Sequence, residues 1–544
     1  MKNQLPSIKN QSISGRQNLG APVNRQNGTF YIKISIFLIL LIWLGVFMAN
    51  KVDLATADLG RHLENGKWLV GNHFNLFEKN SPVHENFYSY TNSDFPVVNH
   101  HWGSGVLFYF IYKLFGFTGL SLFYIIFSLA IFAMFFQIAR QKSNFTAAAL
   151  LSLLLIPLMA ERGEIRPEIF SYFFAGVFFW ALLSWQEKKL ATSRLFALPI
   201  LMILWVNLHV YFFAGLFIIG VFWLSGIGQL IFSKLSDEEF SEKARGVKSL
   251  TIVLFLSALG SLINPFGIKG LLYPFQIFKN YGYTIVENKS VSFVESYGIV
   301  NSNFFLIKVV LIFLLLSFVL LFFADRKKIS FSSLVFAVFF GTMGWLAIRN
   351  LTLLGFFALP VLAENISGIF SLKEKERNPA QEDGLSVLYI FIFVFAAIVS
   401  YQFISLHSTD RGIGLLPENE KAAEFFRKEN IKGPVFNNYD IGGYLIWNLY
   451  PQEKVFVDNR PEAYPDSFFS EVYKPMQDDP AVFEKIDKEY DFNAIFFYRN
   501  DITPWGVNFQ KAISKNSQWK KAYEDDFASI YIKRDGNNKP LIEQ

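Results

Sequence analysis

The run FFLIKVVLIFLLLSFVLLFFA spans residues 304–324 and contains a single charged side chain, that of Lys308. As a helix, it is long enough to cross the roughly 30 Å hydrocarbon core of a membrane. Comparable apolar runs lie near residues 31–49, 118–139, 145–159, 168–185, 195–209, 211–232, 249–263, 330–346, 352–370 and 385–405. With the quoted run included, the sequence predicts a mainly α, polytopic membrane bundle of about eleven transmembrane helices.

The composition agrees with a chain that lies largely in lipid. Its 544 residues are 52% hydrophobic, 18% aromatic and 17% charged, and the mean hydropathy is +0.29. A soluble globular chain is less apolar and more charged. The absence of Cys from the sequence excludes disulfides, thiolate metal sites and cysteine nucleophiles. The formal charge of +5 is too small for this length to indicate a nucleic-acid partner.

The charges between the apolar runs predict the orientation in the membrane. Residues 1–30 carry basic but no acidic side chains, and we expect them to form a disordered cytoplasmic tail. A large first outer loop then covers residues 50–117 and includes a short interfacial helix over 102–115. If successive helices cross the membrane in alternating directions from this start, every predicted inner loop is basic, as the positive-inside rule requires. These basic residues are Arg140, Lys142, Lys188, Lys189, Arg194, Lys234, Lys243, Arg245, Lys248, Arg326, Lys327, Lys328, Lys373, Lys375 and Arg377.

The transmembrane domain is therefore predicted over residues 31–405, and the polar residues 406–544 predict a small α/β domain on the outer side. We expect a helix over 418–429 and strands over 434–436, 454–457, 494–498 and 528–533. Gly442 and Gly443 open a short apolar helix but lack a phosphate-loop pattern, so no nucleotide cofactor is expected. Asp458 and Arg460 favour a structural ion pair, with acceptor recognition as the alternative.

Polar residues that are costly near a membrane gather at the predicted outer ends of the helices. They are Asp58, His62, His100, His101, Arg162, Arg166, Glu168, Asn207, His209, Asn264, Arg349 and Asn350. Ionisable groups at membrane depth usually face a cavity. We therefore expect one outward-facing polar cavity between helices. Its substrate-binding wall is predicted from His100, His101, Arg162, Glu168, Asn207, His209 and Asn264.

Asp58 and His62 lie one turn apart on a predicted amphipathic helix, on a shared face. A carboxylate beside an imidazole can take a proton from a hydroxyl group or help to hold a divalent cation. Both residues are therefore catalytic candidates. The alternative is a local Asp–His ion pair that caps an interfacial helix.

Arg166 and Arg349, the latter followed by Asn350, are expected at the level of the lipid headgroups. A guanidinium group there can hold a phosphate with two parallel hydrogen bonds, so these residues are candidates for a lipid-phosphate site. Snorkelling toward ordinary headgroups, or pairing with Glu164 or Glu168, is the alternative. The histidines match no known zinc spacing, which favours hydrogen-bonded interface residues over metal ligands.

The quoted residues resemble motifs of the GT-C superfamily of polytopic glycosyltransferases, particularly bacterial members with an aspartate in a large first outer loop and a C-terminal outer domain. The first-loop motifs are Asp58-Leu59-Gly60-Arg61-His62-Leu63 followed by Gly66, Phe87-Tyr88-Ser89-Tyr90-Thr91 and Asn99-His100-His101-Trp102. The later ones are Arg166-Pro167-Glu168, Asn207-Leu208-His209, Asn264-Pro265-Phe266-Gly267 and Arg349-Asn350. The resemblance covers most of the chain.

The resemblance implies an inverting glycosyltransferase that takes a sugar from a polyprenyl phosphate or pyrophosphate, with Asp58 as the catalytic carboxylate. Transfer would occur on the outer face of the membrane, in bacteria the inner membrane, to a glycan, lipid or protein acceptor. The resemblance leaves open whether a divalent cation, Mg²⁺ or Mn²⁺, is required. Many members have a second acidic residue in the outer loops, and this sequence has no clear counterpart of it. The alternatives are an oligosaccharyltransferase acting on Ser or Thr of exported proteins, a transporter, and a non-catalytic assembly protein that holds lipid-linked glycan.

Overall fold

The structure is a computed structural model that describes residues 22–541 apart from 56–57, 235, 277–278, 280, 371–386, 388–389, 397 and 399–409. Three predicted features therefore lie wholly or mostly outside the described residues. They are the N-terminal tail, the inner loop that carries Lys373, Lys375 and Arg377, and the eleventh apolar run over 385–405.

The membrane part is helical throughout, and every apolar run from 31–49 to 352–370 falls on a helix. Its main helices are α1 (Pro22–Met48), α2 (Leu59–Gly71), α3 (Trp102–Lys142), α4 (Phe145–Met159), α5 (Glu168–Gln186), α6 (Ala197–Leu208), α7 (Phe213–Phe232), α8 (Asp237–Gly260), α11 (Ser302–Asp325), α12 (Phe331–Leu346) and α13 (Leu351–Phe370). Short helical turns connect them: η1 (Thr192–Phe196), η2 (Val210–Phe212), α9 (Ile268–Leu272), η3 (Tyr273–Phe275), η4 (Val286–Asn288), α10 (Val291–Ser296), η5 (Arg326–Lys328) and η6 (Ile348–Asn350).

The helices begin where the sequence supplies caps. The Asn144 side chain accepts a hydrogen bond of 2.9 Å from the backbone N–H of Ala147 at the start of α4, and Ser236 and Glu239 form a capping box at the start of α8. The predicted interfacial helix over 102–115 is the first part of α3, and non-helical backbone at Gly116 (φ 64°) separates it from the membrane run. Only glycine adopts such backbone without strain, so this residue lets the chain turn from the interface into the membrane.

Within the described part of the chain, six helical segments are long and apolar enough to cross a membrane. They are Phe30–Met48, Trp102–Lys142, Glu168–Gln186, Val210–Phe232, Ser302–Lys328 and Ile348–Phe370. Three further apolar helices are shorter, Phe145–Met159, Thr192–Leu208 and Phe331–Leu346, and α8 begins with charged residues. The chain is thus an integral membrane protein. Fewer than eleven of the described helices are long enough to cross a membrane, so the predicted number of eleven is not confirmed.

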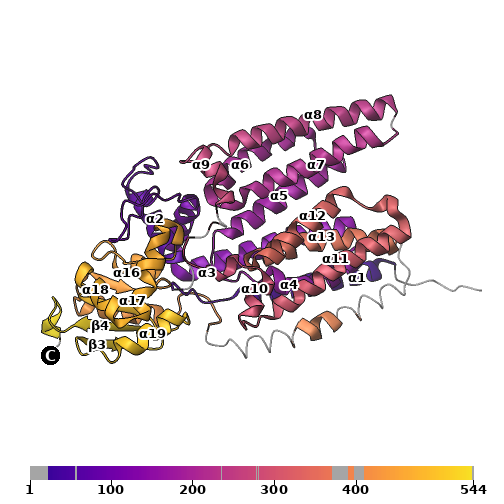
Figure 1. The fold of residues 1–544 in the computed structure, drawn as a ribbon. Coiled ribbons are helices and arrows are strands. Elements are labelled where there is room, and N and C mark those ends of the chain that lie inside the picture. The colour runs from indigo at the N-terminus through magenta and orange to yellow at the C-terminus, as the bar shows by residue number, and fades with distance from the viewer. Residues whose placement is uncertain are drawn as a thin grey trace, which may run out of the picture.

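The bundle has two ends of different character (Figure 1). The turn between α7 and α8 lies at the end away from the C-terminal unit, as do the basic residues that follow α3 and α11. There the Lys142 ammonium pairs with Glu364 at 2.8 Å, and Lys328 donates to the Gly368 carbonyl at 3.0 Å. The polar helix ends and the C-terminal unit share the opposite end.

The C-terminal unit is a four-stranded mixed sheet covered by helices. Its strands are β1 (Val435–Asn437), β2 (Ala494–Tyr498), β3 (Trp519–Glu524) and β4 (Ala528–Lys533), in the order β1-β2-β4-β3. Strands β1 and β2 are parallel, whereas β4 runs antiparallel to both β2 and β3. Its helices are α15 (Glu418–Lys428), α16 (Gly442–Leu449), α17 (Pro475–Asp478), α18 (Pro480–Tyr490) and α19 (Pro504–Ile513), with helical turns Pro461–Ala463, Phe468–Tyr473 and Lys539–Leu541.

The strand predicted over 454–457 is wrong. This segment bridges to the first outer loop instead, through reciprocal backbone hydrogen bonds of Val455 with Tyr88 (3.0 Å) and Tyr90 (3.1 Å). Its β-type sequence therefore joins two distant regions and does not extend the sheet.

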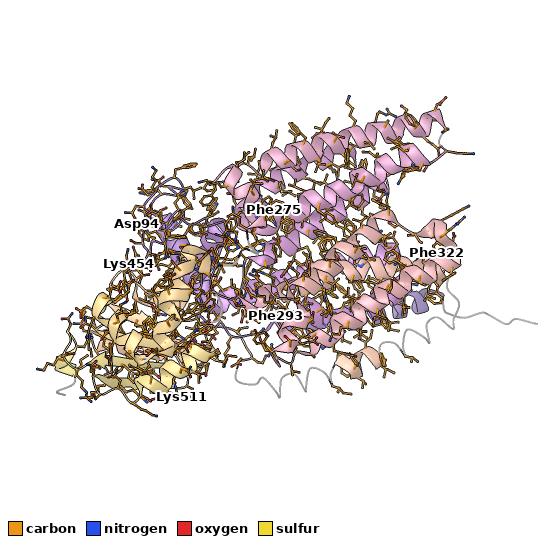
Figure 2. The ribbon with its side chains drawn as sticks, in the orientation of Figure 1. Asp94, Phe275, Phe293, Phe322, Lys454 and Lys511 are labelled. Atoms are coloured by element: carbon orange, nitrogen blue, oxygen red, sulfur yellow. The ribbon has the colours of Figure 1, made fainter. Side chains whose placement is uncertain are left out.

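The surfaces of the two parts of the molecule differ in chemistry. Figure 2 shows exposed Phe322 on the bundle and exposed Lys511 on the C-terminal unit.

Helix α2 joins the two parts of the molecule. Its predicted apolar stripe of Leu59, Leu63 and Leu69 is fully buried. A Cβ atom on Gly60 would overlap the Gly443 carbonyl oxygen of α16, so backbone meets backbone at this contact. On the other side, α2 packs against the start of α3. The glycine pair at the start of α16 thus serves close packing.

Candidate functional site

A cavity of about 1790 Å³ lies where the polar helix ends meet the C-terminal unit. Its membrane-side wall comes from the segment between α4 and α5, from η4 and from η6. Its other wall comes from the start of α2, the end of the first outer loop and the C-terminal unit. Of the predicted site residues, it is lined by Asp58, His62, His100, His101, Arg162, Arg166, Glu168 and Arg349.

Three arginines converge on the membrane-side wall. Arg162 and Arg166 come from the turn that precedes α5, and Arg349 comes from η6, at the entry to α13. Glu168 Oε1 lies 2.9 Å from Arg349 Nη2 and 3.4 Å from Arg162 Nη2, so one carboxylate bridges two guanidinium groups. This carboxylate is only 3% exposed. The bridge fixes the two arginines relative to each other before any ligand arrives.

Glu287 of η4 completes this cluster and was not predicted as a site residue. Its Oε2 lies 2.6 Å from Arg162 Nη1 and 3.4 Å from Arg166 Nη1, and its Oε1 lies 4.0 Å from Arg349 Nη1. Burial alone would raise the pKa of the Glu287 carboxyl, but Arg162 and Arg166 outweigh burial and hold that pKa well below its usual range. The residue is therefore a fixed negative charge at the centre of the three arginines.

Asp58 stands at the other side of the cavity, at the N-terminal end of α2. Its Oδ2 lies 3.3 Å from Arg61 Nη2, one turn further along the helix. Burial raises the pKa of the Asp58 carboxyl, while the positive charge of Arg61 opposes this effect. A carboxylate with a raised pKa is a stronger proton acceptor than an exposed one.

Asp58 and His62 both line the cavity, but the alternative of a direct Asp58–His62 ion pair is wrong. Asp58 pairs with Arg61, whereas the His62 ring packs edge-on against His101, with centroids 5.3 Å apart. His101 in turn stacks on His209 at 5.1 Å. Burial lowers the pKa of His100 to about 3 and that of His62 well below its usual range, so these rings are neutral near pH 7.

Four predicted site residues lie behind the cavity wall and hold its elements in place. Asn207 accepts from Trp102 Nε1 at 2.9 Å and donates to the Ile203 and Ile263 carbonyls. Asn264 caps its own turn, and Asn350 accepts from the Tyr211 hydroxyl at 2.7 Å. His209 is fully buried and is hydrogen-bonded to Ser171. Amide and imidazole side chains at helix ends satisfy backbone groups as readily as ligands, and sequence spacing does not separate these uses.

The C-terminal unit contributes a wall of the cavity, in which Tyr439 and Asp440 were not predicted as site residues. Tyr439 and Asp440 follow β1, and Glu462 follows the Asp458–Arg460 segment; all three line the cavity. Burial, together with the nearby charges of Asp501 and Asp58, raises the pKa of Asp440 to about 7, and burial raises that of Glu462. Within the described residues, neither carboxyl forms an ion pair.

Asp458 and Arg460 form the structural pair that the sequence favours. Arg460 Nε lies 3.1 Å from Asp458 Oδ1 and its Nη2 lies 2.5 Å from Oδ2, in a two-pronged contact that excludes most solvent. Arg460 Nη2 also donates to Asn86 of the first outer loop at 3.0 Å. This pair therefore helps to attach the C-terminal unit to the loop.

The carboxylates of the arginine cluster are engaged by guanidinium groups and not by one another. Over the residues that the structure describes, no group of three or more His, Asp or Glu side chains is arranged to ligate a cation. Glu168 and Glu287, which have the right chemistry, face arginines. Carboxylates engaged in this way are poor ligands for a divalent cation, because their oxygens already accept hydrogen bonds from guanidinium groups.

Solved structures with the same arrangement of helices include archaeal enzymes. The chain is similar to the oligosaccharyltransferase AglB from Archaeoglobus fulgidus in complex with an inhibitory peptide and a dolichol-phosphate, with a TM-score of 0.55, 12% identity, and coverage of 86% of this chain and 69% of that one. It is also similar to the Archaeoglobus fulgidus oligosaccharyltransferase tethered to an acceptor peptide, with a TM-score of 0.56, 12% identity, and coverage of 92% and 74%. This chain has the GT-C fold.

A weaker likeness, with a TM-score of 0.46 and 13% identity, is to ArnT from Cupriavidus metallidurans bound to undecaprenyl phosphate; it covers 94% of this chain and 98% of that one. No protein-family model and no curated protein sequence matches the chain. The GT-C-like fold that the short motifs predict is confirmed by the likeness to the two oligosaccharyltransferase structures with TM-scores of 0.55 and 0.56, although the sequences share few residues.

Proposed function

We propose that the protein is a membrane glycosyltransferase that moves a sugar from a polyprenyl phosphate or pyrophosphate to an acceptor on the outer face of the membrane. One observation carries the proposal: three arginines held in a fixed cluster share a single large cavity with the carboxylate of Asp58. The cavity supplies both groups that the reaction needs, a site for a charged lipid headgroup and a proton acceptor.

Arg162, Arg166 and Arg349 form the donor site. Guanidinium groups bind phosphate oxygens through parallel, charge-assisted hydrogen bonds, and a site that excludes water strengthens these contacts. Because Glu168 already orients two of the arginines, little reorganisation is needed when the phosphate binds. The sequence-based assignment of Arg166 and Arg349 to the donor is retained here, and Arg162 is added to it.

Asp58 acts as the general base. Its carboxylate takes the proton from an acceptor hydroxyl, and the resulting oxygen nucleophile attacks the anomeric carbon of the donor sugar. The bond between that carbon and the phosphate oxygen breaks, and the arginines stabilise the phosphate that leaves. A single displacement of this kind inverts the configuration at the anomeric carbon. Arg61, 3.3 Å from Asp58, keeps the carboxylate oriented.

The proposed location is the bacterial inner membrane, with the N-terminus in the cytoplasm and the C-terminal unit outside. The basic residues at one end of the bundle and the cavity at the other support this orientation, because cytoplasmic loops carry an excess of Lys and Arg. In this orientation the cavity faces the periplasm, where no nucleotide sugar is available as donor.

A second candidate is oligosaccharyl transfer to Ser or Thr of exported proteins. The likeness to the Archaeoglobus fulgidus oligosaccharyltransferase favours a polypeptide as acceptor, since one structure of that enzyme is tethered to an acceptor peptide. In either case the acceptor hydroxyl would reach Asp58 from the side of the C-terminal unit.

The decisive experiment gives the purified protein undecaprenyl phosphate linked to a radiolabelled sugar and follows transfer to extracts of membranes and of secreted proteins. Label in glycolipid or polysaccharide supports the main proposal, and label in secreted polypeptides supports the second candidate. Movement of the lipid across vesicles without release of undecaprenyl phosphate would identify a transporter and refute both. Binding without turnover, across a panel of sugars, would identify a non-catalytic assembly protein.

A further inference from the structure

Glu287 occupies the place where the proposed donor phosphate should lie. Its two carboxylate oxygens contact Arg162 and Arg166 and approach Arg349, so that one anion faces all three cations. The other two carboxylates of the cluster differ from it, because the Glu168 side chain is only 3% exposed and the Glu164 side chain, 2.8 Å from Arg166, is 44% exposed. Glu287 is therefore the carboxylate whose position a phosphate would take.

The charges of the cluster balance only while Glu287 is in place. Three guanidinium groups face three carboxylates, those of Glu164, Glu168 and Glu287. Three neighbouring guanidinium groups repel one another, and a partly buried excess of charge is costly. An anion at the position of Glu287 is thus required at all times, from the protein itself or from a ligand.

The backbone around Glu287 is fixed on both sides. On the C-terminal side, Arg349 Nη1 donates to Asn288 Oδ1 at 2.9 Å and the Ile348 N–H donates to the Lys289 carbonyl at 3.1 Å. On the N-terminal side, the Tyr283 ring stacks on Tyr439 of the C-terminal unit with centroids 4.1 Å apart. The Glu287 carboxylate, in contrast, is 23% exposed to the cavity. It can leave the arginines by rotation of its side chain while the segment stays in place.

We propose that Glu287 is a built-in placeholder for the donor phosphate, and that the site is matched to the single negative charge of a phosphodiester, as in a sugar linked through one phosphate to a polyprenyl chain. This inference rests on the proposed function and narrows its donor from two classes to one.

The charge balance supports the narrower class. When Glu287 rotates away, the three arginines and the two remaining carboxylates leave one net positive charge. A phosphodiester carries one negative charge and restores neutrality. A pyrophosphate diester carries two, which leaves the cluster with an excess negative charge beside Glu164, Glu168 and the displaced Glu287. Like charges brought together in a site of low dielectric are strongly unfavourable.

The test measures the affinity of the purified protein in lipid nanodiscs for two synthetic probes, the methyl diester of undecaprenyl phosphate and the methyl diester of undecaprenyl pyrophosphate. We expect the wild-type protein to bind the monophosphate probe about tenfold more tightly, since it adds no excess charge. Glu287→Gln removes the competing anion, so both affinities should rise, by about fivefold or more for the monophosphate probe and further for the pyrophosphate probe. The selectivity between the probes should therefore narrow.

Glu295→Gln is the matched control, because it removes the same charge from the same outer segment, where Glu295 pairs with Lys308 at 2.6 Å outside the cavity lining. It should leave both affinities unchanged. Equal or preferred binding of the pyrophosphate probe by the wild-type protein would overturn the inference without any variant. So would an unchanged or weakened affinity of Glu287→Gln for the monophosphate probe. In both cases the proposed function survives, whereas failure of the wild-type protein to bind either probe overturns it together with the inference.

Discussion

The two walls of the cavity handle charge in opposite ways. On the membrane side, Arg162, Arg166 and Arg349 are all matched by carboxylates at ion-pair distance. On the C-terminal side, Asp440 and Glu462 have no ion-pair partner within the described residues, and their pKa values are raised by burial. The membrane-side wall therefore stays ionised at every physiological pH, whereas on the C-terminal wall the pKa of Asp440 is raised to about 7 and that of Glu462 is raised.

This difference indicates which substrate each wall suits. A permanently charged cluster that needs an anion to stay balanced fits a lipid phosphate, whose charge does not depend on pH in the physiological range. A carboxyl group whose pKa is raised can be protonated and then donates as well as accepts hydrogen bonds. Both capacities suit the hydroxyl groups of an acceptor. Asp58 lies on the side of the cavity that faces the arginines, where a donor sugar and an acceptor hydroxyl would meet.

Replacing Asp58 should have the largest effect, because it removes the proposed base on the side of the cavity that faces the arginines. We expect Asp58→Asn to lower turnover by about 10³-fold, within the range of general-base catalysis, with little change in donor affinity. The rate of sugar release from the donor and a donor-binding titration measure these two quantities. Asp94→Asn, an exposed aspartate of the same outer loop (Figure 2), is the control and should behave like the wild-type protein. Retained turnover in Asp58→Asn would remove Asp58 from the mechanism.

Breaking the arginine wall should have the next largest effect. Arg349→Ala leaves the buried Glu168 with Arg162 alone at 3.4 Å and removes one prong of the phosphate site. We expect donor binding to weaken about 100-fold and the unfolding free energy to fall by about 3 kcal/mol, because a buried carboxylate loses a partner. Arg349→Lys keeps the positive charge but lacks the two-pronged guanidinium group (the fork). It should recover part of the donor affinity and part of the unfolding free energy. Equal effects of the two variants on donor affinity would mean that the fork is unimportant.

The close contact between α2 and α16 of the C-terminal unit offers a third test. A Cβ atom on Gly60 would overlap the Gly443 carbonyl, so Gly60→Ala should push α2 away from α16. We expect a loss of about 1–3 kcal/mol in stability, as for other overpacked contacts, and faster proteolysis between the bundle and the C-terminal unit. Gly71→Ala is the matched control, since the same helix has open space at that glycine. Equal melting temperatures and equal proteolysis rates of the two variants would show that the Gly60–Gly443 contact does not join the two parts.

The sequence predicts the bundle well because apolar length is a local property. It also brings Asp58, Arg166 and Arg349 to one cavity, since ionisable residues are tolerated near a membrane only where they face polar space. Glu287 is missed because its role depends on Arg162 and Arg166, which lie 125 and 121 residues away along the chain, so that no local spacing indicates the contact. For the same reason Asp440 is missed, and the segment at Val455 is mistaken for a sheet strand.

The smallest expected effect tests the C-terminal wall through pH. The folded protein holds the Asp440 proton up to about pH 7, whereas the unfolded chain releases it near pH 4. Because the folded state binds the proton more tightly, the stabilising contribution is present below the unfolded pKa and is lost as pH rises toward 7. Asp440→Asn stays neutral, so its melting temperature should exceed that of the wild-type protein by about 1–3 °C at pH 8, with the advantage gone near pH 4.

Asp526→Asn is the control for this comparison, because Asp526 also lines the cavity but is exposed to solvent. Its melting temperature should follow that of the wild-type protein at both pH values. A pH-independent difference between Asp440→Asn and the wild-type protein would show that Asp440 is ionised in the folded state. The C-terminal wall would then carry a fixed negative charge, and the contrast between the two walls would be one of sign alone. An acceptor bearing a positive charge would in that case be preferred over a neutral polyol.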